Sequence, residues 1–314
     1  MQKILFLKCL IILVSGTCIA QHCEVAKTLA GHSEFVLGID ESPDGNYLIS
    51  GSEDDSFIIW DKDDNMIFQK KAHKRSVNDV KFSPDSQQFL TAGSDQTFSI
   101  WNTDGSKVKD VKADDIYVKT ITYSHDGKYI LSGGGDNTAR LWSKEGELIR
   151  EFTGHECTIY QASFSPDDKL IVLGSCDGSF SLWKTSGERI FKKEHHESGV
   201  SSASFSPDGK YILTASFDKT AALWDLDGSL ITEYNGHSGE INQAEFSKDG
   251  DYILTACEDA IARLWKLDGT LLKSFGDADN VDYLAGTFSN DGKYIITSSR
   301  YNNIIYWKLD SELK

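Results

Sequence analysis

Seven tryptophans recur at a nearly constant spacing, and this repeat constrains the fold more than any other feature of the chain. Neighbouring tryptophans are separated by 41 residues five times and then by 42, and none lies outside this register. Each of the four prolines stands 17 residues before a tryptophan, in a Ser-Pro-Asp turn. A period near 40 residues indicates a propeller or a solenoid array. The tryptophans are Trp60, Trp101, Trp142, Trp183, Trp224, Trp265 and Trp307.

Each unit has the same order of strands and turns. A first strand, such as 77–82, alternates polar and apolar residues and ends in a Ser-Pro-Asp-Gly type of turn. A second strand, such as 211–216, leads to a tight turn that contains Asp, and a third strand, such as 138–142, ends at Trp. A short fourth strand follows, such as 230–234. Runs this short with regular turn signals predict an all-β protein without crossover helices.

Seven units of four antiparallel strands predict a single seven-bladed β-propeller over residues 24–309, followed by a short C-terminal tail at 310–314. The last unit ends soon after Trp307 and lacks its fourth strand, whereas residues 25–29 form an extra strand before the first unit. We therefore expect the N-terminal strand to complete the last blade. A ring closed in this way has no free internal edge and needs no second copy to cover one, so we expect a monomer.

The charge balance restricts the partners. Asp and Glu number 48 and Lys and Arg number 32, which gives a net charge of −16. This surplus repels phosphate backbones, so we do not expect nucleic acid binding. A protein or peptide with basic residues fits this charge.

Residues 1–20 have the pattern of a secretory signal peptide. A basic start with Lys3 and Lys8 is followed by an apolar run and by small residues at Cys18 and Ala20, which suit cleavage before Gln21. The run is too short for a membrane span, and no other is long enough. The sequence thus predicts a secreted or periplasmic protein. The alternative is an uncleaved apolar N-terminus on a cytoplasmic protein.

The cysteines do not form a metal-binding pattern. Two of the six lie in the predicted signal peptide, and Cys23, Cys157, Cys176 and Cys257 lack metal-ligand spacing. The repeat register puts Cys157 and Cys176 at the same end of one unit, which leaves a disulfide open, but the favoured interpretation is two thiols. The acidic run at 61–65 lacks the central Gly of a calcium loop, and no glycine-rich phosphate cradle occurs. No metal or cofactor is expected.

The pairs Gly31-His32, Gly154-His155 and Gly236-His237 each place a His 28 residues before a Trp, and Trp60-Asp61 and Trp224-Asp225 follow the same register. This set resembles the WD-repeat proteins over residues 24–309. In that family a His, a second-strand Ser or Thr, the turn Asp and the Trp form a hydrogen-bonded tetrad in each blade. The resemblance implies tetrads of His32, Ser50, Asp54 and Trp60 in blade 1; His73, Thr91, Asp95 and Trp101 in blade 2; His196, Thr214, Asp218 and Trp224 in blade 5; and His237, Thr255, Asp259 and Trp265 in blade 6.

Other blades depart from this pattern. Blade 3 has Asp114 at the His position, and blade 4 has Leu173 where Ser or Thr is expected, with Ser175 nearby. Blade 7 has Tyr301 in place of the turn Asp and Asp279 near the His position, so we expect it to be the least stable blade. Glu41 stands where the other six blades have Phe or Tyr between blades. Because the position adjoins a turn, we expect a solvated carboxylate; the alternative is a carboxylate with a raised pKa.

A recurring Ser, His and Asp is also the composition of a hydrolase triad. The trio appears in most blades, however, whereas an active site is a single constellation, and buried Trp and His side chains need hydrogen-bond partners. The protein is therefore predicted not to be an enzyme. The alternative is a propeller enzyme with one site at the channel mouth, which would need converging acids or a metal there.

In the WD-repeat family, partners commonly dock on the face formed by the fourth-to-first and second-to-third strand connections around the central channel. We call it the channel face. Three register positions fall there: three and five residues after the His position, and the one before the turn Asp. These positions vary between blades while the framework repeats. The residues predicted to bind a partner are Phe35, Glu53, Tyr117, Lys119, Tyr160, Phe217, Glu258 and Arg300, and Glu53, Glu240 and Glu258 suggest a partner with Lys or Arg.

The sequence therefore predicts a non-catalytic scaffold for a protein or peptide partner. An intracellular WD-repeat scaffold with an uncleaved N-terminus is the competing interpretation.

Overall fold

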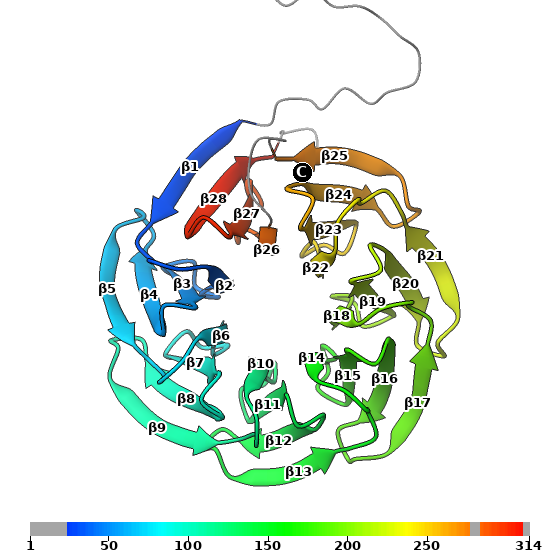
Figure 1. The fold of residues 1–314 in the computed structure, drawn as a ribbon, viewed down its shortest axis with the longest axis horizontal. Helices are drawn as coiled ribbons and strands as arrows, with labels where there is room; N and C mark the ends of the chain where they lie inside the picture. The colour runs from blue at the N-terminus through cyan, green and yellow to red at the C-terminus, as the bar shows by residue number, and fades with distance from the viewer. Residues whose placement is uncertain (1–23, 277–282, 310–314) are drawn as a thin grey trace, which may run out of the picture.

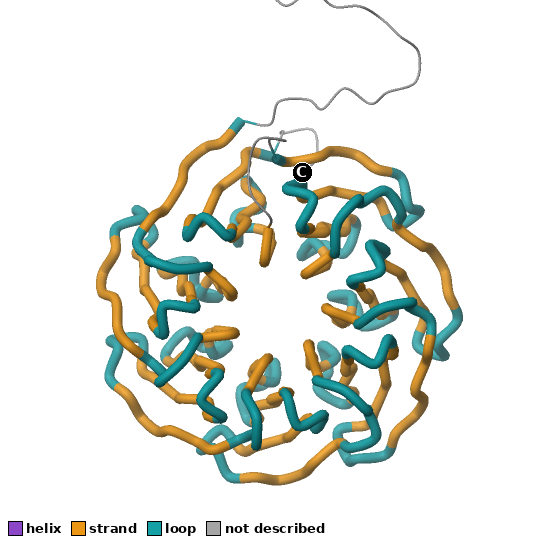
Figure 2. The backbone as a smooth tube through the Cα atoms, viewed as in Figure 1, coloured by secondary structure: helices purple, strands orange, loops and turns teal. Residues whose placement is uncertain are grey.

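The computed structural model describes residues 24–276 and 283–309. Seven four-stranded antiparallel sheets surround a central channel as the blades of a propeller (Figure 1), and the described residues contain no helix. The strands run through each blade and the turns and loops connect them (Figure 2). The all-β, seven-bladed prediction is confirmed.

The first three blades hold β2 to β13. They are β2 (Val36–Glu41), β3 (Tyr47–Ser52), β4 (Ser56–Asp61) and β5 (Met66–Lys71) in blade 1; β6 (Val77–Phe82), β7 (Gln88–Gly93), β8 (Thr97–Asn102) and β9 (Lys107–Lys112) in blade 2; and β10 (Val118–Tyr123), β11 (Tyr129–Gly134), β12 (Ala139–Ser143) and β13 (Leu148–Phe152) in blade 3.

The other four blades hold the remaining strands. They are β14 (Ile159–Phe164), β15 (Leu170–Ser175), β16 (Ser179–Lys184) and β17 (Arg189–Glu194) in blade 4; β18 (Val200–Phe205), β19 (Tyr211–Ser216), β20 (Ala221–Asp225) and β21 (Leu230–Tyr234) in blade 5; β22 (Ile241–Phe246), β23 (Tyr252–Cys257), β24 (Ala262–Lys266) and β25 (Leu271–Phe275) in blade 6; and β26 (Tyr283–Phe288), β27 (Tyr294–Ser299), β28 (Asn303–Lys308) and β1 (Val25–Ala30) in blade 7.

The ring closes through its N-terminal strand. β1 pairs antiparallel with β28, from Val25 opposite Trp307 to Ala30 opposite Asn303, and so supplies the fourth strand of blade 7. Figure 1 shows β1 on the outside of β28, in the place that β5 has in blade 1. The predicted closure is confirmed.

The turn between the first and second strands is built by its own side chains. The Ser206 hydroxyl donates to Asp208 at 2.7 Å and accepts the backbone N–H of Tyr211 at 2.9 Å. Gly209 has a φ of +70°, a conformation that a residue without Cβ adopts at no steric cost. This turn therefore fixes the register of the two strands that it joins.

Apolar side chains fill the space between neighbouring blades. Tyr123 at the end of β10 packs with Leu90 and Ile100 of the preceding blade in one buried cluster. Phe82 does the same against Ile49 and Phe57 of blade 1. The core is thus a series of interfaces between blades, and the first strand of each blade is left to line the channel.

Candidate functional site

One register position from every blade lines the central channel. It lies five residues after the His position, on the innermost strand, and these side chains enclose a narrow cavity of about 90 Å³. The lining residues at this position are Leu37, Asn78, Lys119, Tyr160, Ser201, Asn242 and Leu284. The structure therefore places the predicted binding residues Lys119 and Tyr160 inside the channel.

The other two register positions lie side by side at the channel mouth. Within a blade, the residue before the turn Asp donates its backbone N–H to the carbonyl of the residue three after the His position. Glu53 donates to Phe35, Phe217 to Gly199 and Glu258 to Glu240, at 2.9–3.0 Å. In blades 1 to 6 these bonds join the two connections of the channel face, so the two register positions are neighbours there.

Three of the predicted aromatic residues belong to blades 3 to 5. The rings of Tyr160 and Phe217 meet edge to face, with centroids 5.3 Å apart. The Tyr117 ring lies over Gly135, where an added Cβ would come within 2.9 Å of it. Its hydroxyl is 3.0 Å from the hydroxyl of Thr158 in the next blade. Burial raises the pKa of Tyr160, and the nearby Tyr117 and Glu240 act in the same direction.

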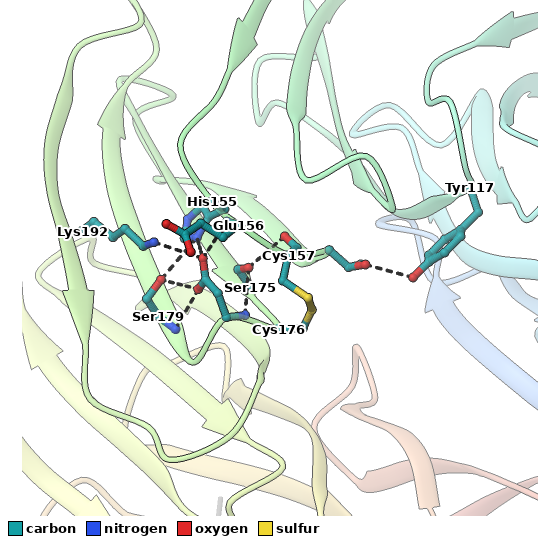
Figure 3. The surroundings of a disulfide bond; sticks show 10 residues. Tyr117, His155, Glu156, Cys157, Ser175, Cys176, Ser179 and Lys192 are labelled. Atoms are coloured by element: carbon teal, nitrogen blue, oxygen red, sulfur yellow. Dashed lines mark hydrogen bonds and ion pairs between the residues drawn. A yellow bond between two sulfur atoms is a disulfide. The ribbon is translucent and has the colours of Figure 1, made fainter.

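A disulfide lies beside these aromatic residues. Cys157 and Cys176 are bonded, with Cα atoms 5.3 Å apart, and they join the two channel-face connections of blade 4. Figure 3 shows the sulfur atoms close to the point where Tyr117 reaches blade 4. The favoured interpretation of two free thiols is therefore wrong. The residue spacing left the pairing open, and the turn geometry of blade 4 brings the two cysteines together.

A second group of predicted residues spans blades 6, 7 and 1. Arg300 forms an ion pair with Glu258 at 2.5 Å, and its guanidinium lies 5.9 Å from the centre of the Phe35 ring. Glu258 is thus already neutralised by a cation of this chain. The other two predicted acids, Glu53 and Glu240, are exposed. Neither forms an ion pair with a described residue.

Lys119 differs from the other lysines of the channel. Lys81 pairs with Asp40 at 3.0 Å, whereas no ion pair joins Lys119 to any residue that the structure describes. Burial lowers the pKa of Lys119, against the attraction of Asp79 and Glu53. Asp79 accepts the backbone N–H of Ile121 at 3.0 Å, so it holds blades 2 and 3 together. The Lys119 ammonium is therefore available to an acceptor that enters the channel.

The residues of the four predicted tetrads are brought together. In blades 1, 2, 5 and 6 the His Nδ1 lies 2.9–3.0 Å from the turn Asp, and the His Nε2 lies 2.7–2.9 Å from the Ser or Thr hydroxyl. The Trp indole N–H donates to the same hydroxyl at 2.9–3.1 Å. Burial opposes ionisation of Asp95, but the hydrogen bonds from His73 and Thr97 outweigh it and hold the pKa of this carboxyl well below its usual range.

Blade 4 forms its tetrad with a residue that the sequence analysis missed. The Ser181 hydroxyl lies 2.7 Å from both His155 Nε2 and Trp183 Nε1. Ser181 is the cross-strand partner of Leu173, which occupies the usual position of the hydroxyl. Ser175, the nearby candidate, bonds instead to the carbonyl of Cys157. The signal in the sequence was a Ser two residues before Trp183, on the facing strand.

Blades 3 and 7 keep only part of the tetrad. Trp142 donates to Ser132 at 2.9 Å and Trp307 to Thr297 at 2.8 Å. In blade 3 Arg140 reaches the turn residue Asp136 at 2.7 Å. Tyr301 of blade 7 is 64% exposed, and Asp279 lies outside the described residues.

The His side chains of the trios lie inside the blades. The His side chains of blades 1, 2, 4, 5 and 6 are 0–2% exposed. In the described part of the chain, His237, Cys257 and Asp259 are the group whose ligand atoms approach as a metal site would require. Burial raises the pKa of the Cys257 thiol to about 12, and the Arg263 guanidinium contacts both His237 and Asp259. The positive charge next to these ligand atoms is therefore already supplied by Arg263.

Glu41 is not solvated as expected. It is half-buried, and it accepts the backbone N–H of Asn290 in blade 7. Burial raises the pKa of the Glu41 carboxyl. The position next to a turn did not expose it, because the turn of the adjoining blade covers it.

The described residues contain no helix that is long and apolar enough to cross a membrane. The predicted signal peptide at 1–20, Cys23 and the tail at 310–314 lie outside the described residues.

Comparison with known protein families agrees with this architecture. The family described as IFT122 first beta-propeller matches residues 16–266 and, in a second overlapping match, 113–314. The chain belongs to this family. Overlapping matches are consistent with a chain of similar units, which can be aligned in more than one register. No curated protein sequence matches the chain.

Proposed function

We propose that this protein is a non-catalytic scaffold of the WD-repeat type, which binds a protein or peptide partner on its channel face. The observation that carries this proposal is the convergence of one variable register position from all seven blades on a single channel cavity. The framework around it repeats, so the variable side chains are the ones that distinguish this surface. Membership of a propeller family whose fold presents such a face is consistent with this function.

The chemistry of the face favours a partner with both an apolar and a basic group. Tyr117, Tyr160 and Phe217 form an aromatic area over blades 3 to 5, and aromatic residues anchor interfaces more than most others do. Glu53 and Glu240 are exposed on the same face. Because Glu258 is paired with Arg300, these two acids are the stronger candidates for meeting Lys or Arg of the partner.

The absence of catalysis is part of the proposal. The repeated Ser, His and Asp trios are buried inside the blades, where their hydrogen bonds satisfy Trp and His side chains. A structural role accounts for all the contacts that these residues make.

We also propose that the protein is exported. The Cys157–Cys176 disulfide supports this, because disulfides persist mainly in oxidising compartments. Residues 1–20, with their basic start and apolar run, would supply the signal. Retention of the protein in the cytosolic fraction with residues 1–20 intact would support the intracellular alternative instead.

The test is affinity capture from fractions of the host, followed by titration of the captured protein. The wild-type chain is compared with the triple variant Tyr117→Ala, Tyr160→Ala, Phe217→Ala. The matched control is Ile67→Ala, Ile149→Ala, Ile231→Ala, which removes apolar side chains that are 46–47% exposed on outer strands. We expect the first variant to lose the partner and the control to keep it. A partner that the folded channel-face variant retains at full affinity would refute the assignment of this face.

A further inference from the structure

Two residues depart from the repeat at the junction between blade 7 and blade 1, which we call the seam. Glu41 of blade 1 occupies the position at which every other blade has an aromatic residue. Tyr306 of blade 7 occupies the position before the Trp, at which every other blade has Ile or Leu. The residues at the first position are Phe82, Tyr123, Phe164, Phe205, Phe246 and Phe288, and those at the second are Ile59, Ile100, Leu141, Leu182, Leu223 and Leu264.

A cavity of about 320 Å³ opens at the seam, lined by both of these residues. Its walls come from β1 and β28, from the β2–β3 and β4–β5 turns, and from the β26–β27 turn. These turns lie at the end of the blades opposite to the channel face. A water molecule takes about 30 Å³ of liquid volume, so the cavity has room for a ligand of several heavy atoms. We call it the seam pocket.

The seam pocket already holds one ammonium group, which belongs to the chain itself. The Lys27 Nζ lies 2.6 Å from both carboxylate oxygens of Asp64. It also stands 3.8 Å from the centre of the Tyr306 ring and 5.9 Å from that of Tyr294. An aromatic face beside a carboxylate is an arrangement that stabilises organic cations. The pocket walls are therefore chemically suited to a positive charge.

Two polar groups of the pocket could accept a further hydrogen bond. Tyr306 is 5% exposed as a whole, but its hydroxyl oxygen is not one of the fully buried unpaired atoms of the described residues; it faces the pocket and makes no hydrogen bond to any residue within 24–276 or 283–309. Glu41 accepts one backbone N–H, from Asn290, and forms no ion pair within the described chain. Polar groups that face such a cavity are paired with water or with a ligand. A donor placed between them would satisfy both.

The charges around the pocket favour a cationic donor. The carboxylates of Glu41, Asp61, Asp64 and Asp291 and the ammonium groups of Lys27 and Lys62 line it. Asp64 pairs with Lys27 and Asp291 with Lys293, so Glu41 and Asp61 are the lining carboxylates without an ion pair to a described residue. Their oxygens do not converge as a metal site requires, since the described residues hold no such group here. The burial that raises the pKa of Glu41 also means that a nearby positive charge would relieve an unfavourable ionisation. An organic ammonium group, with its apolar stem against the tyrosine rings, fits better than a metal ion.

We propose that the seam pocket binds a compact organic amine, whose ammonium group donates hydrogen bonds to the Glu41 carboxylate and the Tyr306 hydroxyl. The amine is either a free small molecule or the side chain of a lysine in another protein. This site lies on the face away from the proposed partner surface and is independent of it.

Titration calorimetry on the full chain tests the proposal with n-butylamine as the free amine. n-Butanol is the uncharged probe of similar shape, and Nα-acetyl-lysine N-methylamide presents a lysine side chain as a peptide would. Four variants accompany the wild type. Glu41→Gln removes the charge, Glu41→Phe restores the aromatic residue of the other blades and fills the pocket, and Tyr306→Phe removes the hydroxyl. Glu53→Gln removes an equal charge from the channel face and is the matched control.

We expect n-butylamine to bind at least tenfold more tightly than n-butanol. Glu41→Gln should weaken amine binding by about tenfold, the effect of losing one hydrogen bond to a charged group, and Glu41→Phe should abolish it. Tyr306→Phe should weaken it a few-fold, and Glu53→Gln should leave it unchanged. Equal binding of the blocked lysine would identify a protein lysine as a suitable occupant, and binding of n-butylamine alone would identify a free amine.

Three results would overturn the proposal. They are equal binding of amine and alcohol, full amine binding by the folded Glu41→Phe variant, and displacement of the amine by Ca²⁺ at an equal concentration. The last would show a metal site instead. The triple channel-face variant Tyr117→Ala, Tyr160→Ala, Phe217→Ala should retain amine binding, so failure of either site can be told from failure of the other.

Discussion

Replacement of Ser181 by Ala tests whether one hydroxyl holds the centre of blade 4. This hydroxyl lies 2.7 Å from His155 Nε2 and 2.7 Å from Trp183 Nε1, and Ser181 is fully buried. In the other complete tetrads the hydroxyl comes from the second strand, where blade 4 has Leu173. The Ser181→Ala variant therefore leaves two buried polar groups with no substitute.

The expected loss of unfolding free energy is about 2–4 kcal/mol. A buried polar group that loses its hydrogen bond costs about 1–3 kcal/mol, and two such groups that share one site do not add fully. The removed hydroxyl is small, so the cavity contributes little. The loss should exceed that of Ser99→Ala, which changes the same register position in blade 2. There the tetrad uses Thr91, and the Ser99 hydroxyl donates to Asp110, whose side chain is 55% exposed. We expect about 1 kcal/mol or less for this control.

Urea unfolding at pH 7, followed by tryptophan fluorescence, measures both changes. The double variant Leu173→Thr, Ser181→Ala moves the hydroxyl across the strand pair to the position that other blades use, and it should recover at least half of the loss. A loss below about 0.5 kcal/mol in Ser181→Ala would refute the argument, because it would mean that the unpaired groups find water or other partners. A double variant no more stable than Ser181→Ala would refute the equivalence of the two strand positions.

Three further results are expected from the structure. Burial raises the pKa of Glu245 to about 7, so the cost of this carboxyl to folding grows as the pH rises from its ordinary pKa of 4.5 to about 7 and is complete above that. Glu245→Gln should therefore stabilise the protein relative to wild type by about 2–3 kcal/mol at pH 8 and much less at pH 5. An equal difference at both pH values in urea unfolding would contradict this. The double variant Cys157→Ser, Cys176→Ser should lose about 3 kcal/mol, as the chain-entropy estimate gives for a loop of this length; dithiothreitol should lower the melting temperature of the wild type and leave that of the variant unchanged. Backbone amides of β27 in blade 7 should exchange with solvent faster than those of β19 in blade 5, because blade 7 retains only the Trp–Thr part of the tetrad, and slower exchange in β27 would show that ring closure stabilises blade 7 more than a tetrad does.

The fold was predictable because it is repeated. A single unit leaves strand ends ambiguous, but seven aligned units fix them by their shared turns, and 77–82, 211–216 and 230–234 coincide with observed strands. The third strand of blade 3 was expected at 138–142 and begins one residue later, at Ala139. Asn137 there has a φ of +65°, as the equivalent Asp55 has in blade 1 (+66°), where the third strand begins at the next residue. The period does not specify strand ends to within one residue, and nothing in the structure explains this shift.

Features that depend on contacts across strands or between blades were not predictable. The role of Ser181 requires the register that places it opposite Leu173. The disulfide requires two turns of blade 4 to bring Cys157 and Cys176 to a Cα distance of 5.3 Å, and a separation of 19 residues is compatible with many other distances. Glu41 is half-buried because Asn290, from the opposite end of the chain, lies over it. The sequence identified Leu173, the two cysteines and Glu41 as unusual, but it did not point to Ser181, and only the neighbours in space determine what each residue does.

The seam combines a departure from the repeat, which the sequence shows, with a contact between blades, which only the structure shows. One substitution there distinguishes a residue kept for binding from a residue kept for packing. Glu41→Phe would replace a half-buried carboxylate of raised pKa with the aromatic side chain that six blades use at this position. Burying a large apolar side chain contributes about 1.5–3 kcal/mol, so we expect the variant to be more stable than wild type by about 1–3 kcal/mol in urea unfolding at pH 7. A stabilising change at a site that the wild type leaves polar is typical of a residue kept for binding. A variant that is less stable than wild type would show that Tyr306 leaves no room for an aromatic ring at position 41. Packing alone would then explain why Glu41 replaces the aromatic residue.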